Sequence, residues 1–586
     1  MCGILLIYSK KGRLNKQNCN RSLGSLQKRG PDATLSSFFL NQQLFIGNTI
    51  LKIVGNIKNK KKLYYSKSKR FVITFNGEIY NYKKISERYK KLSKPVNDTD
   101  LLVNIHDLKN EIKIAKILDG MFAYCVFDQK KEKIFFASDA QGEKKIFIYN
   151  DKDLLICSSN ITSVKKTLKK NKIQIKKSGL KNYFDLRHFS FFNETIYNNI
   201  SYIDPGVMYT YDIKSNIISK KIFDDPVDWI SKKKYNYLNR NQSITLSYFD
   251  KLLGKVAKKL TPKISFSSVM SGGIDSTLQL KLLMINNKGT IKDSLFVDHG
   301  DKDPISRNIL KFEKFIYSKI NILKLDAKKY YLNLKETYKC LQLPFFSHDL
   351  VGRFLIYKFF KNKKYKVIFA ADGADEVFGG YEAYRKINWE DKRIFNPSPY
   401  SSSTNIFSDK NQEIKIKSNA LWLRAFKKYN TFLSLKESRM QATLFTDYFM
   451  QAIGVHNIST DLLAGENSIE VRNIFTTKEV IKNALNLPIK YKINLKNSHL
   501  FVLKPLLKLL FSKYLHKKLI YKKQGFSGFP NESIYYLKKK QKKQLFSFIK
   551  KFQYKYKLNK AIEWKLINCF YFKYFCKQKI DLNKLF

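Results

Sequence analysis

The chain has 586 residues and a mass of 68.9 kDa, which is too long for one hydrophobic core, so we expect at least two domains. Its 44% hydrophobic and 15% aromatic residues favour globular folding and exclude global disorder. The formal net charge of +62 comes from lysines spread along the whole chain, which favours a solvated lysine coat over an arm for nucleic acid, although its field attracts polyanions.

The apolar and cysteine patterns exclude further classes of protein. No apolar run reaches the roughly 18–20 residues that a membrane-spanning helix needs, and we expect no secretory signal. The 7 cysteines form no CxxC pair and no cluster with histidine. The cysteine pattern predicts a reduced, cytoplasmic protein without a zinc site. From the short apolar runs and the evenly spread lysines, we expect neither membrane insertion nor a specific nucleic-acid partner.

Residues 1–212 alternate short apolar runs with turn signals, a pattern typical of antiparallel sheet. One helical stretch is predicted at 99–110 (TDLLVNIHDLKN). The Pro-Gly turn in YIDPGVMYTYDI, at 202–213, has a predicted strand on both sides and marks the end of this part. The charged segment 213–242 is predicted to be an irregular linker.

From 243 onward, predicted strands alternate with predicted helices, which favours a parallel α/β sheet with ligand sites at the carboxyl ends of its strands. The strands are expected at 263–270 (KISFSSVM), 294–300 (SLFVDHG) and 366–373 (KVIFAADG). The segment 387–412 is predicted to be a long surface insertion, and mainly helices follow it.

The most specific motif is VMSGGIDST, from Val269 to Thr277, where an apolar strand runs into Ser-Gly-Gly and a helix begins at about Asp275. The glycines let backbone N–H groups approach a phosphate, and the helix N-terminus adds its dipole. Asp275 and Ser276 also suit a plain helix cap. The whole motif resembles the pyrophosphate-binding loop of ATP pyrophosphatases, which cleave ATP between its α and β phosphates.

A second motif, FAADGADEVFGGYEAYR from Phe369 to Arg385, also follows a predicted strand. Its carboxylates Asp372, Asp375 and Glu376 are close in sequence, which suits Mg²⁺ and a triphosphate. The alternative is a capped turn punctuated by glycines. Because carboxyl ends of parallel strands meet at one edge of a sheet, we expect this motif to lie beside VMSGGIDST.

The N-terminus supplies a third set of residues. If Met1 is removed, a thiol and a free α-amino group belong to the same residue, Cys2. An α-amine has a pKa of roughly 7.7–8.0, so it can act as general base for the thiol without a histidine. The stretches that accompany Cys2 are KRGPD at 28–32, FNGEIYN at 75–81, NDTD at 97–100 and LDGMFAYCVFD at 118–128.

Together these motifs resemble glutamine-dependent asparagine synthetase over nearly the whole chain. DLLAGENSIEVRNIF at 461–475, Lys504 and KKQGFSGFP at 522–530 follow in the order of that family. The resemblance implies an α/β protein of two domains. An N-terminal-nucleophile αββα sandwich, with glutaminase activity, is expected at 1–212. A parallel adenine-nucleotide-binding domain of the PP-loop kind, with added helices, is expected at 243–586.

The resemblance also implies roles for single residues. Cys2 attacks the side-chain amide of glutamine, and Asn76 with the Gly77 N–H forms the oxyanion hole. Asp372 is the catalytic carboxylate of the second site. The expected glutamine-binding residues are Ile50, Leu51, Lys52, Ile53, Val54, Asn76, Gly77, Glu78 and Asp98. The expected ATP-binding residues are Met270, Ser271, Gly272, Gly273, Asp275, Ser276, Val297, Ala370, Ala371 and Lys504, with Mg²⁺ carried by Asp275 and Asp375.

Three departures from the family pattern bear on function. Ile50 stands where the family has an arginine that grips the glutamine α-carboxylate, so Lys52 or Arg70 would have to supply the cation. Asp372 replaces the family glutamate and is one methylene shorter. The family R-D-x-x-G-x-K-P becomes SDAQGEKK at 138–145.

We therefore predict an ATP-dependent amide ligase that uses glutamine or free ammonia, with asparagine synthesis from aspartate as the leading reaction. An alternative keeps the mechanism and changes the acceptor carboxylate, for instance to a uronic-acid sugar of a surface polysaccharide. Two further alternatives are an RNA-acting PP-loop ATPase and a catalytically silent scaffold.

The partners of the predicted ligase would be small molecules, namely glutamine, ATP and the acceptor. Whether the protein forms a homodimer is left open.

Overall fold

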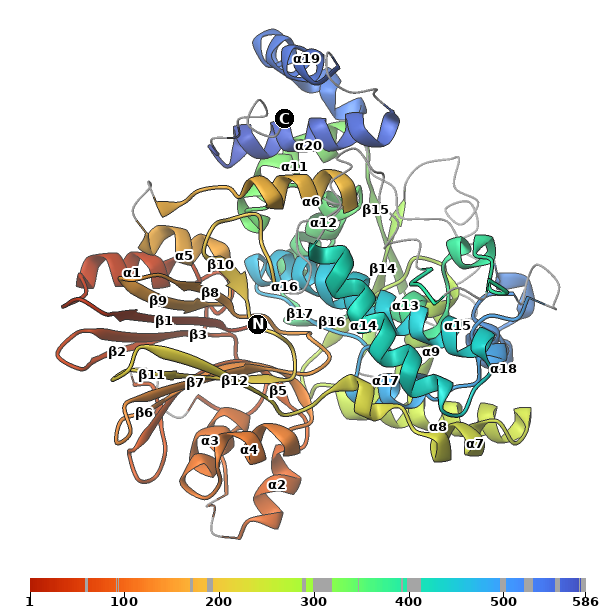
Figure 1. The fold of residues 1–586 in the computed structure, drawn as a ribbon, viewed down its shortest axis with the longest axis horizontal. Coiled ribbons are helices and arrows are strands. Elements are labelled where there is room, and N and C mark those ends of the chain that lie inside the picture. Colours follow the sequence, from red (N-terminus) through yellow and green to blue (C-terminus); the bar gives the residue numbers. More distant parts are fainter. Residues whose placement is uncertain are drawn as a thin grey trace.

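The N-terminal part of the computed structural model consists of two antiparallel sheets that face one another (Figure 1). The first sheet has the strand order β10-β8-β9-β1-β3-β2, and the second has the order β12-β11-β7-β6-β5-β4. The strands of the first sheet are β1 (Gly3–Ser9), β2 (Ala33–Phe39), β3 (Leu44–Ile50), β8 (Phe147–Asn150), β9 (Leu154–Ser158) and β10 (Ile200–Tyr202). Those of the second are β4 (Tyr64–Tyr65), β5 (Phe71–Ile79), β6 (Gly120–Asp128), β7 (Lys133–Ser138), β11 (Val207–Asp212) and β12 (Ile217–Ile222).

The structure describes most of the chain. Its residues are 1–57, 62–90, 92, 94–168, 172–186, 193–286, 291–298, 319–345, 347–391, 394–397, 413–495, 502–520, 531–553, 559–578 and 580. The predicted segment KKQGFSGFP and most of the predicted insertion at 387–412 lie outside them.

Strand β1 is buried along its whole length because both faces of the first sheet are covered. Ile4, Leu6 and Tyr8 point into the core between the two sheets, whereas Leu5 and Ile7 pack towards the helices outside. Those helices are α1 (Lys16–Gly24) and α5 (Ile161–Thr167), whereas α6 (Lys177–Leu186) lies further out and contacts the second domain, where the Tyr183 hydroxyl donates to the Phe345 carbonyl. The second sheet is covered by α2 (Tyr82–Arg88), α3 (Asp98–Asn104) and α4 (Glu111–Ile117) (Figure 1). The predicted αββα sandwich is confirmed.

The structure differs from the predicted linker at 213–242. Ile217–Ile222 form β12, which pairs with β11 and extends the second sheet, so this sheet continues past residue 212. The sequence of β12, IISKKI, lies at the edge of the sheet and is mostly exposed, so it shows no alternating apolar pattern. The rest of the segment also contains helix α7 (Lys232–Leu238) and the first residue of α8 (Gln242–Leu260).

The second part is built on a parallel sheet with the strand order β15-β14-β13-β16-β17. Along β14, Phe296 packs against one layer of helices, and Leu295 and Val297 pack against the other, as expected for a sheet covered on both faces. The predicted parallel α/β domain is confirmed. Its strands are β13 (Phe266–Val269), β14 (Ile291–Asp298), β15 (Lys319–Lys324), β16 (Val367–Phe369) and β17 (Glu470–Arg472).

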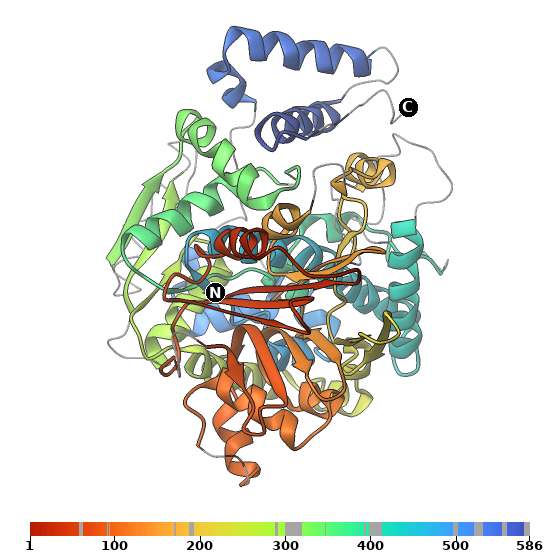
Figure 2. The same cartoon turned by 90° about the vertical axis from the view of Figure 1, so that its left-hand side faces the viewer.

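Helices make up most of the remaining structure. They are α9 (Ile274–Asn286), α11 (Ala327–Leu341), α12 (Leu350–Asn362), α13 (Ala374–Phe378), α14 (Glu413–Asn430), α15 (Leu435–Asp447), α16 (Asn457–Glu466), α17 (Lys478–Ala484), α18 (Pro505–Tyr514), α19 (Lys539–Gln553) and α20 (Lys560–Phe575). Helices α19 and α20 lie at one end of the molecule, away from the sheets (Figures 1 and 2). Within the described part of the chain, no helix combines the length and apolarity that crossing a bilayer requires.

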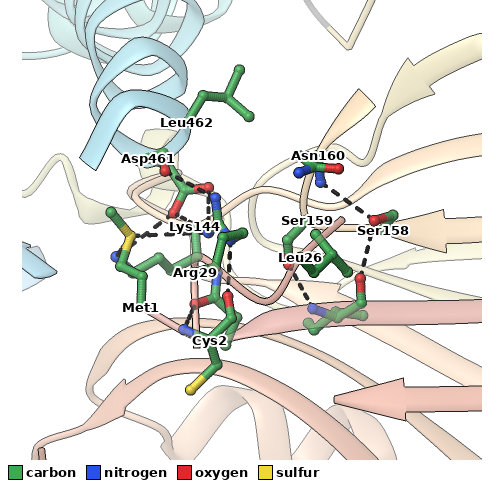
Figure 3. A network of polar contacts seen from close by, with 12 residues as sticks. Met1, Cys2, Leu26, Arg29, Lys144, Ser158, Ser159, Asn160, Asp461 and Leu462 are labelled. Atoms are coloured by element: carbon green, nitrogen blue, oxygen red, sulfur yellow. Dashed lines mark hydrogen bonds and ion pairs between the residues drawn. The ribbon is translucent and has the colours of Figure 1, made fainter. Parts of the chain in front are cut away.

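A buried ion pair joins the two domains next to the N-terminus (Figure 3). The Arg29 guanidinium donates to both carboxylate oxygens of Asp461, at 3.0 and 2.9 Å, and both side chains are 2% exposed. Arg29 Nε also donates to the backbone oxygen of Cys2 at 3.0 Å. A Cβ at Gly465 would lie 2.5 Å from the guanidinium, so this glycine leaves room for the pair.

We expect Asp461→Ala to destabilise the protein by about 3–5 kcal/mol, because it leaves the buried Arg29 charge without a partner. The measurement is the midpoint of thermal unfolding. A matched control is Lys255→Gln, which removes an exposed ion pair with Glu479 and is expected to cost less than about 1 kcal/mol. Equal shifts for both variants would contradict the role given to the buried pair.

Candidate active sites

A cavity of about 530 Å³, counting its open mouth, lies at the end of β1 where the two sheets meet the second domain. It brings together most of the residues that the sequence assigned to glutamine. The lining residues are Cys2, Asn48, Ile50, Leu51, Lys52, Ile53, Val54, Asn56, Ile57, Tyr64, Phe75, Gly77, Glu78, Asn97, Asp98, Thr99 and Glu470. Asn76 is fully buried directly beside it.

Cys2 is held in place through its backbone. Its N–H donates to Asn76 Oδ1 at 2.9 Å, and its carbonyl accepts from Arg29, while the thiol points away from this network (Figure 3). Met1 is buried, and its sulfur lies 3.2 Å from Lys144 Nζ. Burial raises the pKa of the Cys2 thiol. The thiol therefore needs a base that removes its proton when it attacks.

Asn76 and Gly77, which the sequence predicted as an oxyanion hole, lie on β5 next to Cys2. Because Asn76 Oδ1 accepts from Cys2, its Nδ2 is left as a buried donor with no hydrogen-bond partner among the described residues. Gly77 has a φ of +142°, and a Cβ there would lie 2.0 Å from the Met121 carbonyl oxygen, so only glycine fits. A buried donor left unpaired is costly unless a ligand or intermediate uses it.

Asp98 and Glu78 place two carboxylates in the same cavity. Asp98 is the first residue of α3, and its carboxylate accepts from the N–H groups of Ile79 at 3.1 Å and Thr99 at 2.8 Å. Burial raises the pKa of Asp98 to about 6. Burial likewise raises the pKa of Glu78, whose carboxylate contacts Arg472. Because Asp98 is charged above about pH 6, its carboxylate can attract a cationic group of a ligand.

The structure distinguishes between Lys52 and Arg70, the two residues that the sequence suggested as replacements for an arginine at position 50. Ile50 ends β3 and lines the cavity, as does Lys52, which is exposed. Arg70 does not line it, because its guanidinium is engaged by both oxygens of Asp128, at 2.8 and 2.6 Å. Lys52 is the one cationic side chain among the described residues that line this cavity.

Several lining residues were not assigned to this site from the sequence, and Asn48 and Glu470 are the two that bear most on its geometry. Asn48 donates from Nδ2 to Gly3 O at 2.9 Å and to Phe75 O at 3.2 Å, so it fixes the residues next to Cys2 and Asn76. Glu470 belongs to β17 of the second domain. No local pattern connects position 470 with a cavity that begins at residue 2, so only the tertiary structure reveals it.

The loop after β13, predicted to bind phosphate, runs directly into a helix and is held by its own serines. Ser271 N–H donates to Ser276 Oγ at 3.0 Å, and Gly273 N–H lies 3.3 Å from Ser271 Oγ, so the two serines fix the loop. Gly272 has a φ of +73°, which favours glycine. Helix α9 begins next, at Ile274. Met270 and Val297 are buried at the ends of neighbouring strands, β13 and β14.

The second motif lies beside this loop, as predicted. Lys504 Nζ is 2.5 Å from both Asp275 Oδ2 and Asp375 Oδ1. Burial lowers the pKa of Lys504, but the two carboxylates outweigh it and raise this pKa overall. The two carboxylates thus converge on the Lys504 ammonium, beside the loop at 271–276. Mg²⁺ is commonly held by one or two carboxylates together with substrate phosphates, so this donor set fits it.

Asp372 follows β16 through Ala370 and Ala371, and it is paired with a cation that the sequence did not single out. Arg353 Nη1 donates to Asp372 Oδ2 at 2.8 Å, and Arg353 Nε contacts Asp349. The spacing of Asp349 and Arg353 at the start of α12 is the local signal that was available. Arg353 therefore fixes the direction of the Asp372 carboxylate.

Comparison with known proteins identifies both halves of the chain. Residues 1–223 match the glutamine amidotransferase domain, and residues 249–547 match asparagine synthase. The chain belongs to the asparagine synthase family. It is accordingly an ATP-dependent ligase that carries a glutamine-hydrolysing domain. The first match ends next to β12, the last strand of the second sheet.

Named relatives in this family are distant. A Methanocaldococcus jannaschii protein that bears the name of a glutamine-hydrolysing asparagine synthetase is 25% identical, over 65% of this chain and 76% of the relative. A glutamine-hydrolysing asparagine synthetase of Bacillus subtilis is 23% identical, over 66% of this chain and 60% of the relative. The enzyme of Gallus gallus is 22% identical, over 66% of this chain and 68% of the relative.

Proposed function

We propose that this family member hydrolyses glutamine at Cys2 and passes the ammonia to an acyl-adenylate that it makes from ATP and a carboxylate. The products are an amide, AMP and pyrophosphate, and aspartate is the leading acceptor. The observation that carries the proposal is the convergence of Cys2, Asn76 and Gly77 at one cavity whose wall includes Glu470 of the synthetase domain. The 7 cysteines of the chain are all free, and this agrees with a location in a reducing compartment such as the cytoplasm.

The glutaminase step uses the N-terminal residue as both nucleophile and base. After Met1 is removed, the α-amine of Cys2 takes the thiol proton while sulfur bonds to the amide carbon of glutamine. The oxygen becomes an oxyanion that accepts hydrogen bonds from Asn76 Nδ2 and the Gly77 N–H. The C–N bond then breaks, ammonia leaves with the proton from the amine, and water hydrolyses the thioester to glutamate.

The synthetase step is assigned to the loop at 271–276 and its neighbours. Ser271, Gly272, Gly273 and Ser276 would hold the pyrophosphate of ATP, and Lys504 would neutralise it. Met270, Val297, Ala370 and Ala371 would flank the nucleotide. Mg²⁺, held by Asp275 and Asp375, would offset phosphate charge. The acceptor carboxylate attacks the α-phosphate, and ammonia then displaces AMP from the acyl carbon.

A second acceptor class is favoured by the surroundings of Asp372. Its carboxylate is one methylene shorter than the family glutamate, and its position is set by Arg353 and Asp349. A displacement of ~1 Å in an active site can change a rate ~100-fold. An acceptor of different shape, such as a uronic-acid sugar, is therefore the alternative to aspartate.

The decisive experiment supplies the purified enzyme with ATP, Mg²⁺ and aspartate, and either glutamine or ammonium. We expect AMP and asparagine with both donors, and we expect Cys2→Ala to abolish only the glutamine-driven reaction. The readouts are AMP, asparagine and the mass of the intact N-terminus. If AMP forms with a uronic acid and not with aspartate, the alternative acceptor is favoured. If Met1 is retained, the assignment of Cys2 as an N-terminal nucleophile is contradicted.

We expect glutamine hydrolysis to depend on pH through Asp98, which would hold the substrate α-ammonium. Burial raises the pKa of Asp98 from 3.8 to about 6. The side chain is therefore a charged carboxylate above about pH 6 and loses that charge below it. The α-amine base of Cys2 must also be unprotonated, so kcat/KM for glutamine should already fall about tenfold per unit below the pKa of that amine, and by a further factor of about ten per unit below about pH 6. In Asp98→Asn this additional fall should be absent and kcat/KM low throughout, whereas an unchanged profile would contradict the assignment.

We expect Lys52 to hold the glutamine α-carboxylate in place of the missing arginine. Lys52→Met should raise KM for glutamine at least tenfold, and Ile50→Arg should lower it, because a guanidinium binds a carboxylate through two hydrogen bonds. Arg70→Lys is the matched control, since Arg70 pairs with Asp128, and its KM should stay within twofold. Equal KM values for Lys52→Met and the unmodified enzyme would contradict this role.

A further inference from the structure

Glu470 is a synthetase-domain residue that forms part of the glutamine cavity. It begins β17, pairs with Val367 of β16, and donates its N–H to Lys366 O at 2.7 Å, so its backbone is fixed within the parallel sheet. It is 2% exposed. The side chain nevertheless lines the same space as Cys2 and Asp98, which belong to the other domain.

Arg472, two residues later, connects the two sites directly. Its Nε donates to Glu470 Oε1 at 3.0 Å, and its Nη2 contacts the carboxylate of Glu78, next to the oxyanion residue Gly77. Its backbone oxygen accepts from the Ala370 N–H at 3.1 Å, at the end of the strand that leads to Asp372. One residue therefore contacts both the glutamine cavity and the edge of the nucleotide site.

The charges at this junction have a clear physical consequence. Glu78, Asp98 and Glu470 place three carboxylates near one another, and Arg472 is the guanidinium buried among them. Burial raises the pKa of Glu470, but Arg472, the N-terminal ammonium and Lys144 together outweigh it and lower this pKa overall, so the carboxylate stays charged. In a site shielded from water, a fixed negative charge favours an incoming cation strongly.

We propose that Glu470 and Arg472 complete the glutamine site from the synthetase domain. Glu470 adds, with Asp98, to the negative potential that receives the α-ammonium of glutamine. Arg472 is a positioning residue that holds Glu78 and Glu470 and ties them to the Ala370–Asp372 segment. This inference rests on the proposed function, because it takes glutamine as the occupant of the cavity.

The test compares two alkylating agents on Cys2 of the full-length, Met1-processed chain. The diazoketone analogue 6-diazo-5-oxo-L-norleucine carries the α-ammonium and α-carboxylate of glutamine, whereas iodoacetamide carries neither. In Glu470→Gln and Arg472→Lys, we expect labelling by the diazoketone to slow at least tenfold and labelling by iodoacetamide to stay within twofold. The readout is the mass of the peptide that contains Cys2.

The control is Lys259→Gln, which breaks another ion pair between the domains, with Asp119, away from the cavity, and should leave both rates within twofold. If Arg472→Lys fails to fold, the nearly isosteric Glu470→Gln decides. Equal slowing with both agents, or unchanged labelling by the diazoketone, would overturn this inference and leave the proposed function standing. If the unmodified enzyme is not labelled by the diazoketone, the proposed use of glutamine fails and this inference fails with it.

Discussion

The buried guanidinium of Arg29 ties the N-terminus to the second domain. It donates to the carbonyl of Cys2 and to both oxygens of Asp461, so the position of Cys2 depends on a residue far away in sequence (Figure 3). A buried charge is tolerated only when it is paired and hydrogen-bonded. This requirement orients the two domains, because the pair forms only when the loop between α1 and β2, which contains Arg29, meets α16.

A second buried ion pair, between Arg472 and Glu78, follows the same logic. Both pairs lie next to the cavity that contains Cys2, since Arg29 donates to the Cys2 carbonyl and Glu78 lines the cavity. Apolar side chains surround them, and one hydrophobic cluster includes Leu5 and Ile7 of the first domain with Leu295 and Val297 of the second. Hydrophobic burial stabilises the interface but is non-directional, so it does not fix how the domains are oriented. The ion pairs specify that geometry because their hydrogen bonds require particular distances and angles.

The two sites differ in how their charges are arranged. The cavity at Cys2 contains an excess of carboxylates around one guanidinium, which suits a substrate that carries an ammonium. At the second site a lysine, Lys504, stands between two carboxylates beside a loop rich in backbone N–H groups, which suits a phosphate chain.

The sequence by itself determined the class of fold, and it predicted the residues of each candidate site. Strand alternation predicted the antiparallel and parallel sheets, and the motifs around Cys2, Asn76 and Ser271 marked the two sites, because each depends on a local pattern. It missed β12, whose charged edge strand has no apolar period, and it left open whether Lys52 or Arg70 lines the cavity. Only the tertiary structure decided that Arg70 is engaged by Asp128, that Arg353 holds Asp372, and that Glu470 belongs to the cavity of Cys2. The physical reason is that these contacts join segments distant in sequence, and their partners are set by how the domains pack and neutralise buried charge.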